Sequence, residues 1–358
     1  MPLSITKNLD VQVIPRHAKR FFCLGTGCLA LLLMLAGCPG QREIKFSGKT
    51  MGTTYHITIV GSYFATAAPL QKAVDAQLEA INASMSTYRP DSEISRFNQM
   101  QRINTPVPIG SDFQEVMQLS RKLFEMTHGA WDGTLDPLID LWGFGRTQRS
   151  KDRIPTAEEI QTRLSSVGFQ HIAIHSDGHL SKRQASVSLD LASVAKGYAV
   201  DTVASLIGEK GFKNYLVEIG GEVYAAGVRI DGQPWRIGIN KPEAGAAFDQ
   251  VYRVVNLQNR AFATSGDYRN FFEIEGQRYA HIIDPRTGYP VANNVVSTSV
   301  TAGTCALADG LATALMVMGA AAGIELVNRM DGVECLIITR DDHDGLSDHA
   351  SRGFQTVD

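Results

Sequence analysis

The chain has 358 residues, of which 44% are hydrophobic and 20% are charged, and its formal net charge is −3. This balance is typical of a globular protein with a substantial core, and the length accommodates one large or two medium domains. Because the net charge is slightly negative and the basic residues are scattered, we expect no nucleic-acid partner.

The first 40 residues have the pattern of a secretory signal. Basic residues at 16–20 precede an apolar run at 21–36, and small residues lead up to Cys38. The run is shorter than the roughly 20 residues of a transmembrane helix, and this order of segments is typical of a signal peptide. Small residues before a cysteine also resemble the bacterial lipobox, which implies that Cys38 carries lipid. An uncleaved anchor helix is the alternative.

After residue 40 the sequence contains no fixed-period repeat, low-complexity tract or linker, which predicts one continuous globular unit. We therefore predict a signal peptide at residues 1–37, a lipidated tether at 38–44, one domain at 45–345 and a C-terminal tail at 346–358.

Two cysteines of the mature chain, Cys305 and Cys335, lack the spacing of a zinc site. They could pair in an oxidising compartment. We favour the interpretation that they are small apolar core residues.

In the first half of the chain the apolar pattern predicts one strand and three helices. Alternating β-branched residues at 54–60 predict a strand. Apolar residues recur at helical spacing over 70–85 and again over 113–124. Thr156 and Glu159 form the sequence signature of a capping box, which predicts the start of a short helix.

In the second half the predicted elements are shorter and alternate more quickly. A strand at 186–191 is expected to run into a helix at 193–208, and Gly220-Gly221 predicts a tight turn between two strands. A buried helix is predicted at 305–318. Helices packed on strand-rich stretches indicate an α+β or mixed α/β fold. Further strands are predicted at 235–239, 251–255, 271–274 and 279–283.

The buried helix carries two polar residues, Asp309 and Thr313, whose spacing of four places them on one face. A buried carboxylate is costly unless it is paired or coordinated. Asp309 could form a salt bridge while Thr313 bonds to the backbone. Alternatively, their oxygens could bind a hard cation such as Mg²⁺. Spacing alone favours the structural interpretation.

Two further segments have polar residues where chemistry is plausible. Lys196 lies in the first turns of a helix that follows a predicted strand, and a helix N-terminus with a lysine favours phosphate. The pattern of a Walker loop is absent, and the signal by itself is weak. His281 lies at the end of a predicted hairpin strand, where histidines are usually structural, but its ordinary pKa near neutrality suits a general base.

Taken together and in order, eight segments of the chain resemble the ApbE family, the FAD:protein FMN transferases. Each segment alone is a weak signal, but their shared order makes chance similarity improbable. They are MGTTYHI (51–57), MSTYRPDSEISRFN (85–98), GAWDGTLDPLIDLWGFG (129–145), LDLASVAKGYAVD (189–201), NYLVEIGGEV (214–223), ATSGDYRNFF (263–272), HIIDPRTGYPV (281–291) and CALADGLATALMVMG (305–319).

The resemblance implies a single unit of mostly antiparallel sheets with packed helices. It also implies a Mg²⁺-dependent enzyme that moves the FMN moiety of FAD to a threonine or serine of another protein and releases AMP. The implied acceptors are subunits of membrane redox complexes that carry an Asp-x-x-Ser/Thr-Gly/Ser-Ala-Thr segment. The implied location is the periplasmic side of the inner membrane, although Pro39 is not the aspartate typical of inner-membrane retention. An FAD pyrophosphatase and a non-catalytic FAD-binding lipoprotein stay open as alternatives.

The resemblance also assigns roles to individual residues. It implies that His281 takes the proton of the acceptor and that Lys196 adds positive potential. It implies that Mg²⁺ is held by the backbone carbonyl of Ser193 and by the side chains of Asp309 and Thr313. The residues implied to contact FAD are Met51, Tyr88, Ala130, Trp131, Asp132, Asp190, Lys196 and Ile282.

Overall fold

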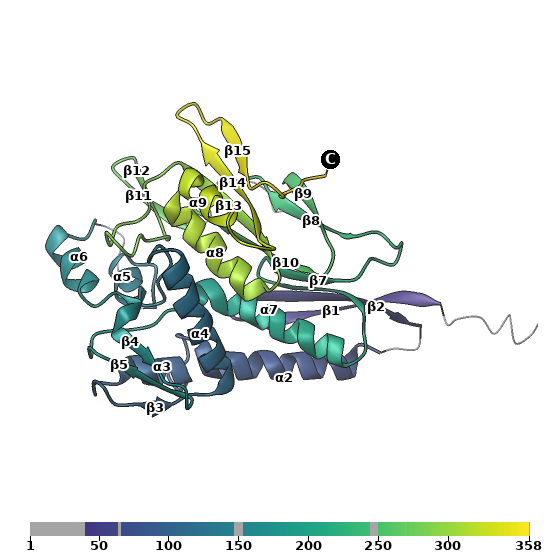
Figure 1. Ribbon diagram of the computed structural model, residues 1–358, viewed down its shortest axis with the longest axis horizontal. Coiled ribbons are helices and arrows are strands. Elements are labelled where there is room, and N and C mark those ends of the chain that lie inside the picture. The colour runs from purple at the N-terminus through teal and green to yellow at the C-terminus, as the bar shows by residue number, and fades with distance from the viewer. Residues whose placement is uncertain (1–39, 64–65, 147–152, 244–249, 269, 358) are drawn as a thin grey trace, which may run out of the picture.

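The computed structural model describes residues 40–63, 66–146, 153–243, 250–268 and 270–357 (Figure 1). The predicted signal peptide and the lipidation site Cys38 lie outside the described residues. The described part is built on an eight-stranded sheet in which neighbouring strands pair in antiparallel orientation. Its strands in spatial order are β1 (Gln41–Thr50), β2 (Thr53–Ser62), β6 (Asn214–Ile219), β7 (Glu222–Ala226), β10 (Arg260–Gly266), β13 (Val295–Ala302), β14 (Glu334–Arg340) and β15 (Leu346–Ala350).

Helices cover one face of this sheet, where α7 (Ala192–Glu209) and α8 (Cys305–Met318) pack against each other and against the strands (Figure 1). α2 (Ala68–Met85) and α4 (Ser111–Met126) pack outside α7, and α9 (Ala320–Val327) lies against β14. Apolar residues at helical spacing turn one stripe of α2 towards this core, as the sequence pattern predicts.

The opposite face of the sheet is covered by the hairpin of β8 (Trp235–Asn240) and β9 (Val251–Leu257). Trp235 and Val255 of this hairpin share a buried cluster with Val223 and Phe262 of the sheet. Side chains of a strand alternate between its faces, so the same strands supply residues to both cores. This two-sided cover explains why β13 is buried at all eight of its residues.

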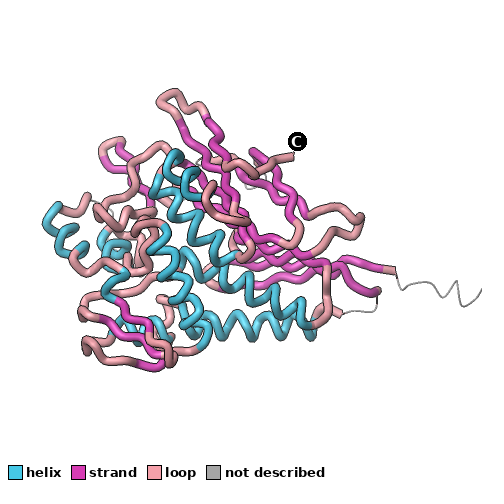
Figure 2. Tube along the Cα trace, in the orientation of Figure 1, coloured by secondary structure: helices cyan, strands magenta, loops and turns pink. Residues whose placement is uncertain are grey.

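Smaller elements complete the end of the molecule that bears the cavity described below (Figure 2). One cluster joins α5 (Asp136–Leu141), α6 (Ala157–Leu164) and the hairpin of β11 (Phe271–Ile274) and β12 (Gln277–Ala280). Beside α3 (Glu93–Gln99) lies a small sheet of β3 (Val107–Pro108), β5 (His179–Lys182) and β4 (Ile172–Ile174), with a 3₁₀ turn at Phe169–His171.

Several predicted elements are confirmed. The helix at 305–318 has the predicted bounds, and both hydrogen bonds of the capping box between Thr156 and Glu159 are formed. Gly220 and Gly221 form the turn between β6 and β7. The mixed α+β class and the antiparallel sheets are likewise observed.

The strand predicted at 186–191 is wrong, because this segment forms no ladder. The backbone N–H of Leu189 donates to the side chain of Asn98, and that of Asp190 donates to the carbonyl of Gly133. These local partners satisfy the backbone without a neighbouring strand. The strand predicted to reach Ile283 ends at Ala280, so His281 lies just beyond it.

The predicted ends of the domain also differ from the structure. β1 begins at Gln41, within the predicted tether, and pairs with β2 over its whole length. β15, within the predicted tail, adds the last strand to the sheet. Polar residues that pair at the edge of a sheet need no apolar run, so their pattern resembles that of a tail.

Two further findings concern the cysteines and the helices. Cys305 and Cys335 are fully buried free thiols, as expected for small core residues. Within the described part of the chain, every helix is too short or too polar to span a bilayer.

Candidate active site

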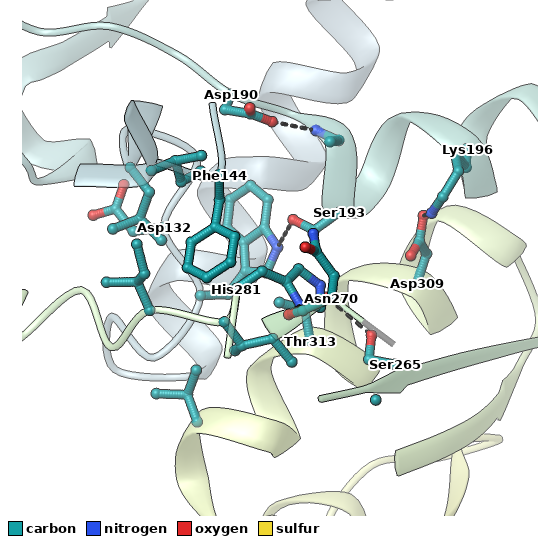
Figure 3. A pocket seen from close by; sticks show the side chains of 18 of the residues that line it. Asp132, Phe144, Asp190, Ser193, Lys196, Ser265, Asn270, His281, Asp309 and Thr313 are labelled. Atoms are coloured by element: carbon teal, nitrogen blue, oxygen red, sulfur yellow. Dashed lines mark hydrogen bonds and ion pairs between the residues drawn. The ribbon is translucent and has the colours of Figure 1, made fainter. Parts of the chain in front are cut away.

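A cavity of about 470 Å³ lies where α7 and α8 meet β7, β10 and the segment that follows β12. This volume falls within the usual range for small-molecule sites. All residues predicted to contact FAD or Mg²⁺ or to act in catalysis line the cavity except Met51, and Figure 3 labels ten of the lining residues. The predicted residues that line it are Tyr88, Ala130, Trp131, Asp132, Asp190, Ser193, Lys196, His281, Ile282, Asp309 and Thr313.

Close approach of α7 and α8 brings the predicted lysine and aspartate together. A Cβ atom at Gly197 would lie 2.4 Å from the carbonyl oxygen of Cys305, so only glycine permits this packing. The backbone N–H of Gly197 donates to Oδ2 of Asp309 at 3.1 Å. In a regular helix this N–H would bond to the carbonyl of Ser193.

Lys196 forms ion pairs with two carboxylates. Its Nζ lies 2.9 Å from Oε1 of Glu222 and 3.6 Å from Oδ2 of Asp309, and both acids are almost fully buried. Burial alone would lower the pKa of Lys196, but Asp309 and Glu222 outweigh it and raise the pKa. Burial raises the pKa of both Glu222 and Asp309, and the Lys196 ammonium opposes that rise. The lysine is therefore protonated throughout the physiological range.

Two residues of the predicted metal set, Thr313 and Ser193, have side-chain hydroxyls that make hydrogen bonds within the protein. Thr313 Oγ1 lies 3.1 Å from Oγ of Ser265, and Oγ of Ser193 accepts from Nε1 of Trp131 at 3.0 Å. Thr313 thus faces the cavity instead of bonding back to its own helix. These contacts fix the orientation of both side chains at the cavity wall (Figure 3).

His281 is oriented by the backbone beside it. Its Nδ1 lies 3.1 Å from the carbonyl oxygen of Asn270, and its ring lies edge-on to Phe144 with 6.3 Å between centroids. A carbonyl only accepts, so in the neutral ring the proton is assigned to Nδ1 and the lone pair to Nε2. This tautomer is the one that a general base requires.

The two aspartates predicted to contact FAD, Asp132 and Asp190, accept hydrogen bonds from the protein itself. Asp132 accepts hydrogen bonds from the N–H and hydroxyl of Thr134 and from the N–H of Phe169. Burial raises the pKa of Asp132, and these donors oppose that rise. Asp190 accepts from the N–H of Ala192, the first residue of α7. Both carboxylates therefore shape the cavity wall through the protein's own backbone.

Met51 is the predicted site residue that the structure does not bring to the cavity wall. It lies in the turn between β1 and β2 with φ of 48° and packs against the main core. Tyr88, in contrast, reaches the wall from the loop after α2, and 76% of its surface is exposed.

The charge of the cavity fits a bound divalent cation. Four of the described residues that line it carry a carboxyl group and one, Lys196, carries a cationic side chain; the four are Asp132, Asp190, Glu222 and Asp309. An anionic substrate is repelled by such a lining unless a cation compensates it. The described residues form no cluster of three His, Cys, Asp or Glu side chains. Mg²⁺ does not require such a cluster, because it keeps several water ligands and binds through one or two carboxylates together with substrate phosphates.

Comparison with known proteins gives the family. The model of the ApbE family matches residues 51–337. The chain belongs to the ApbE family. Relatives described as FAD:protein FMN transferases, from Haemophilus influenzae and Vibrio cholerae, are 42% and 44% identical to it. Their alignments cover 93% and 91% of this chain and 97% and 96% of the relatives.

Solved ApbE structures have the same fold. The flavin transferase ApbE from Vibrio cholerae aligns with a TM-score of 0.80 at 42% identity, over 88% of this chain and 98% of that one. The apo form of the Pseudomonas stutzeri flavinyl transferase ApbE aligns with a TM-score of 0.79 at 37% identity, over 88% and 96%.

The residue roles implied by the resemblance located most of the cavity but left out part of its polar wall, although the residues left out lie within the quoted segments. Glu222, Ser265 and Asn270 line the cavity and contact predicted site residues. Glu222 directly follows the Gly-Gly turn, a position at which the sequence pattern predicts an ordinary hairpin residue. The available signal was an acidic residue that begins an otherwise apolar strand.

Proposed function

We propose that this chain is a Mg²⁺-dependent FAD:protein FMN transferase. It would join the FMN moiety of FAD to a threonine or serine hydroxyl of another protein and release AMP. The supporting observation is that a chain of the ApbE family gathers Lys196, Asp309, Thr313 and His281 around one acid-rich cavity.

The residues that would hold Mg²⁺ are the Asp309 carboxylate, the Thr313 hydroxyl and the Ser193 carbonyl. All three belong to residues that line the cavity, and oxygen donors of these kinds are those that Mg²⁺ takes. When bound, the ion supplies positive charge that neutralises phosphate oxygens during phosphoryl transfer.

The chain's own residues would align the reactants and move one proton. The acceptor oxygen forms a bond to the FMN-side phosphorus while the bond from that phosphorus to AMP breaks. Nε2 of His281 takes the proton of the acceptor hydroxyl, because Nδ1 is held by the Asn270 carbonyl. Lys196 adds positive potential beside the phosphates. Trp131 and Ile282 provide an apolar wall suited to a flavin ring.

We also propose that Cys38 carries a lipid anchor that holds the domain at the periplasmic side of the inner membrane. The support is the signal-like pattern of residues 16–38. The proposed acceptors are subunits of membrane redox complexes that carry the Asp-x-x-Ser/Thr-Gly/Ser-Ala-Thr segment. Labelling the chain in bacteria with a palmitate analogue tests the anchor, and Cys38→Ala should abolish the label.

The activity is tested by mixing the full chain, purified in detergent, with FAD, Mg²⁺ and a protein that carries the acceptor segment. Flavin fluorescence on the acceptor after denaturing electrophoresis is the expected result. An acceptor with its final threonine changed to valine is the matched control and should stay dark. Free FMN and AMP without labelled acceptor would favour a pyrophosphatase. Bound but unchanged FAD would favour a storage protein.

A further inference from the structure

Lys196 lies between two buried carboxylates that come from different elements. Glu222 begins β7, whereas Asp309 lies on α8, and the lysine on α7 reaches both. Asp309 is the only carboxylate in the proposed Mg²⁺ set. Without a bound cation, the Lys196 ammonium is therefore the counter-ion of Asp309, the carboxylate that the cation would need.

The carboxylates of Asp309 and Glu222 differ in their hydrogen-bond partners and in their distance from the Lys196 ammonium. Oδ2 of Asp309 already accepts from the Gly197 N–H and lies 3.6 Å from the ammonium. Oε1 of Glu222 lies closer to it, at 2.9 Å, and among the described residues Oε2 finds no hydrogen-bond partner. Glu222, which belongs to the lining of the same cavity, therefore has an acceptor atom that is unused within the described part of the chain.

A divalent cation on Asp309 would repel the ammonium beside it, and the repulsion between like charges is strong in a buried site. Lys196 must then be held by another negative group. We propose that Glu222 is a positioning residue that holds Lys196 away from Asp309, so that a divalent cation can take the Asp309 carboxylate. This inference rests on the proposed function, because it concerns the same metal and phosphate site.

The test measures metal binding directly in the full chain in detergent. Mn²⁺ serves as the probe, and the electron paramagnetic resonance signal of free Mn²⁺ reports its binding without FAD. Glu222→Gln removes the charge at nearly unchanged volume. Glu218→Gln is the matched control, because Glu218 lies in the same hairpin, outside the cavity lining, and the amide oxygen can still accept from Gly221.

Glu222→Gln should raise the Kd for Mn²⁺ at least about 10-fold, as is usual when a residue that orients a metal ligand is lost. Glu218→Gln should leave it unchanged. The double variant Glu222→Gln with Lys196→Met should recover most of the lost affinity, because the competing ammonium is gone. This recovery is the readout that a general structural role of Glu222 would not produce.

Two results would overturn the inference while leaving the proposed function intact. In the first, the chain with Glu222→Gln binds Mn²⁺ as well as the wild type. In the second, the double variant stays as weak as the single one, which would make Glu222 a direct source of attraction for the metal. A wild-type chain that binds no Mn²⁺ and transfers no FMN would overturn both. If Glu222→Gln fails to fold, Glu222→Asp, which shortens the reach to Lys196, should weaken Mn²⁺ binding, and unchanged binding would refute the inference.

Discussion

Replacing Lys182 with methionine tests how the chain supports the segment that leads into the active site. Lys182 is fully buried on β5, and its Nζ donates to the carbonyls of Asn98, Ala185 and Val187 at 3.0, 3.0 and 3.1 Å. The last two carbonyls belong to the irregular segment that ends at Asp190 of the cavity wall. Methionine fills a similar volume but leaves all three acceptors without the ammonium.

Leaving a buried acceptor without its hydrogen-bond donor typically costs about 1–3 kcal/mol, so the loss of all three bonds is expected to cost on the order of 3–5 kcal/mol. For a domain of this size the loss corresponds to a fall in melting temperature of roughly 10 °C. The assay is intrinsic tryptophan fluorescence of the full chain during heating. Lys122→Met is the control, because Lys122 is exposed on α4 and its loss should change stability by less than about 0.5 kcal/mol.

The effect of Lys182→Met should also depend on pH. Burial lowers the pKa of Lys182 from 10.5 to about 8. Between these two values the unfolded chain binds more protons than the folded chain, so this lysine's contribution to the free energy of unfolding increases with pH. The loss of stability in the variant should therefore grow between pH 8 and pH 10, by up to about 3 kcal/mol. A variant that melts within about 2 °C of wild type at both ends of this range would refute the reasoning.

Three further outcomes are expected. Asp309→Asn should lower transfer at least about 10³-fold, because the proposed metal set loses its carboxylate; more than a tenth of the wild-type rate in the fluorescence assay would contradict this. His281→Ala should slow transfer roughly 10²- to 10⁴-fold while FAD, followed by flavin fluorescence, still binds; an unchanged rate would remove His281 as the base. Deleting residues 346–358 should lower the melting temperature by at least about 5 °C, because β15 closes the edge of the sheet, and unchanged melting would show that these residues are a tail.

Periodicity predicted the helices that bury one face or are buried all round. The stripe from Leu70 to Met85 and the apolar run at 305–318 each have one clear pattern, and both helices are found. β13 was missed because it is buried on both faces and shows no alternation of apolar and polar residues. β15 was missed for the opposite reason, since most of its residues are exposed.

The site could be located from motifs, but its contacts could not be predicted. Lys196 and Glu222 are 26 positions apart, and Asp309 follows much later, so only the packing of α7 and α8 against each other and against β7 brings them together. The local sequence pattern therefore allowed two interpretations of Asp309, as a salt-bridge partner or as a metal ligand. The structure shows the salt bridge to Lys196 and places Thr313 at the same cavity wall.

Covalent transfer is tested most directly by the intact mass of the acceptor protein after incubation with the full chain, FAD and Mg²⁺. The account predicts that the acceptor gains the mass of one FMN less water and that one AMP is released for each modified acceptor. His281→Ala should form this product slowly. FAD cleavage to FMN and AMP with an acceptor of unchanged mass would contradict the central claim.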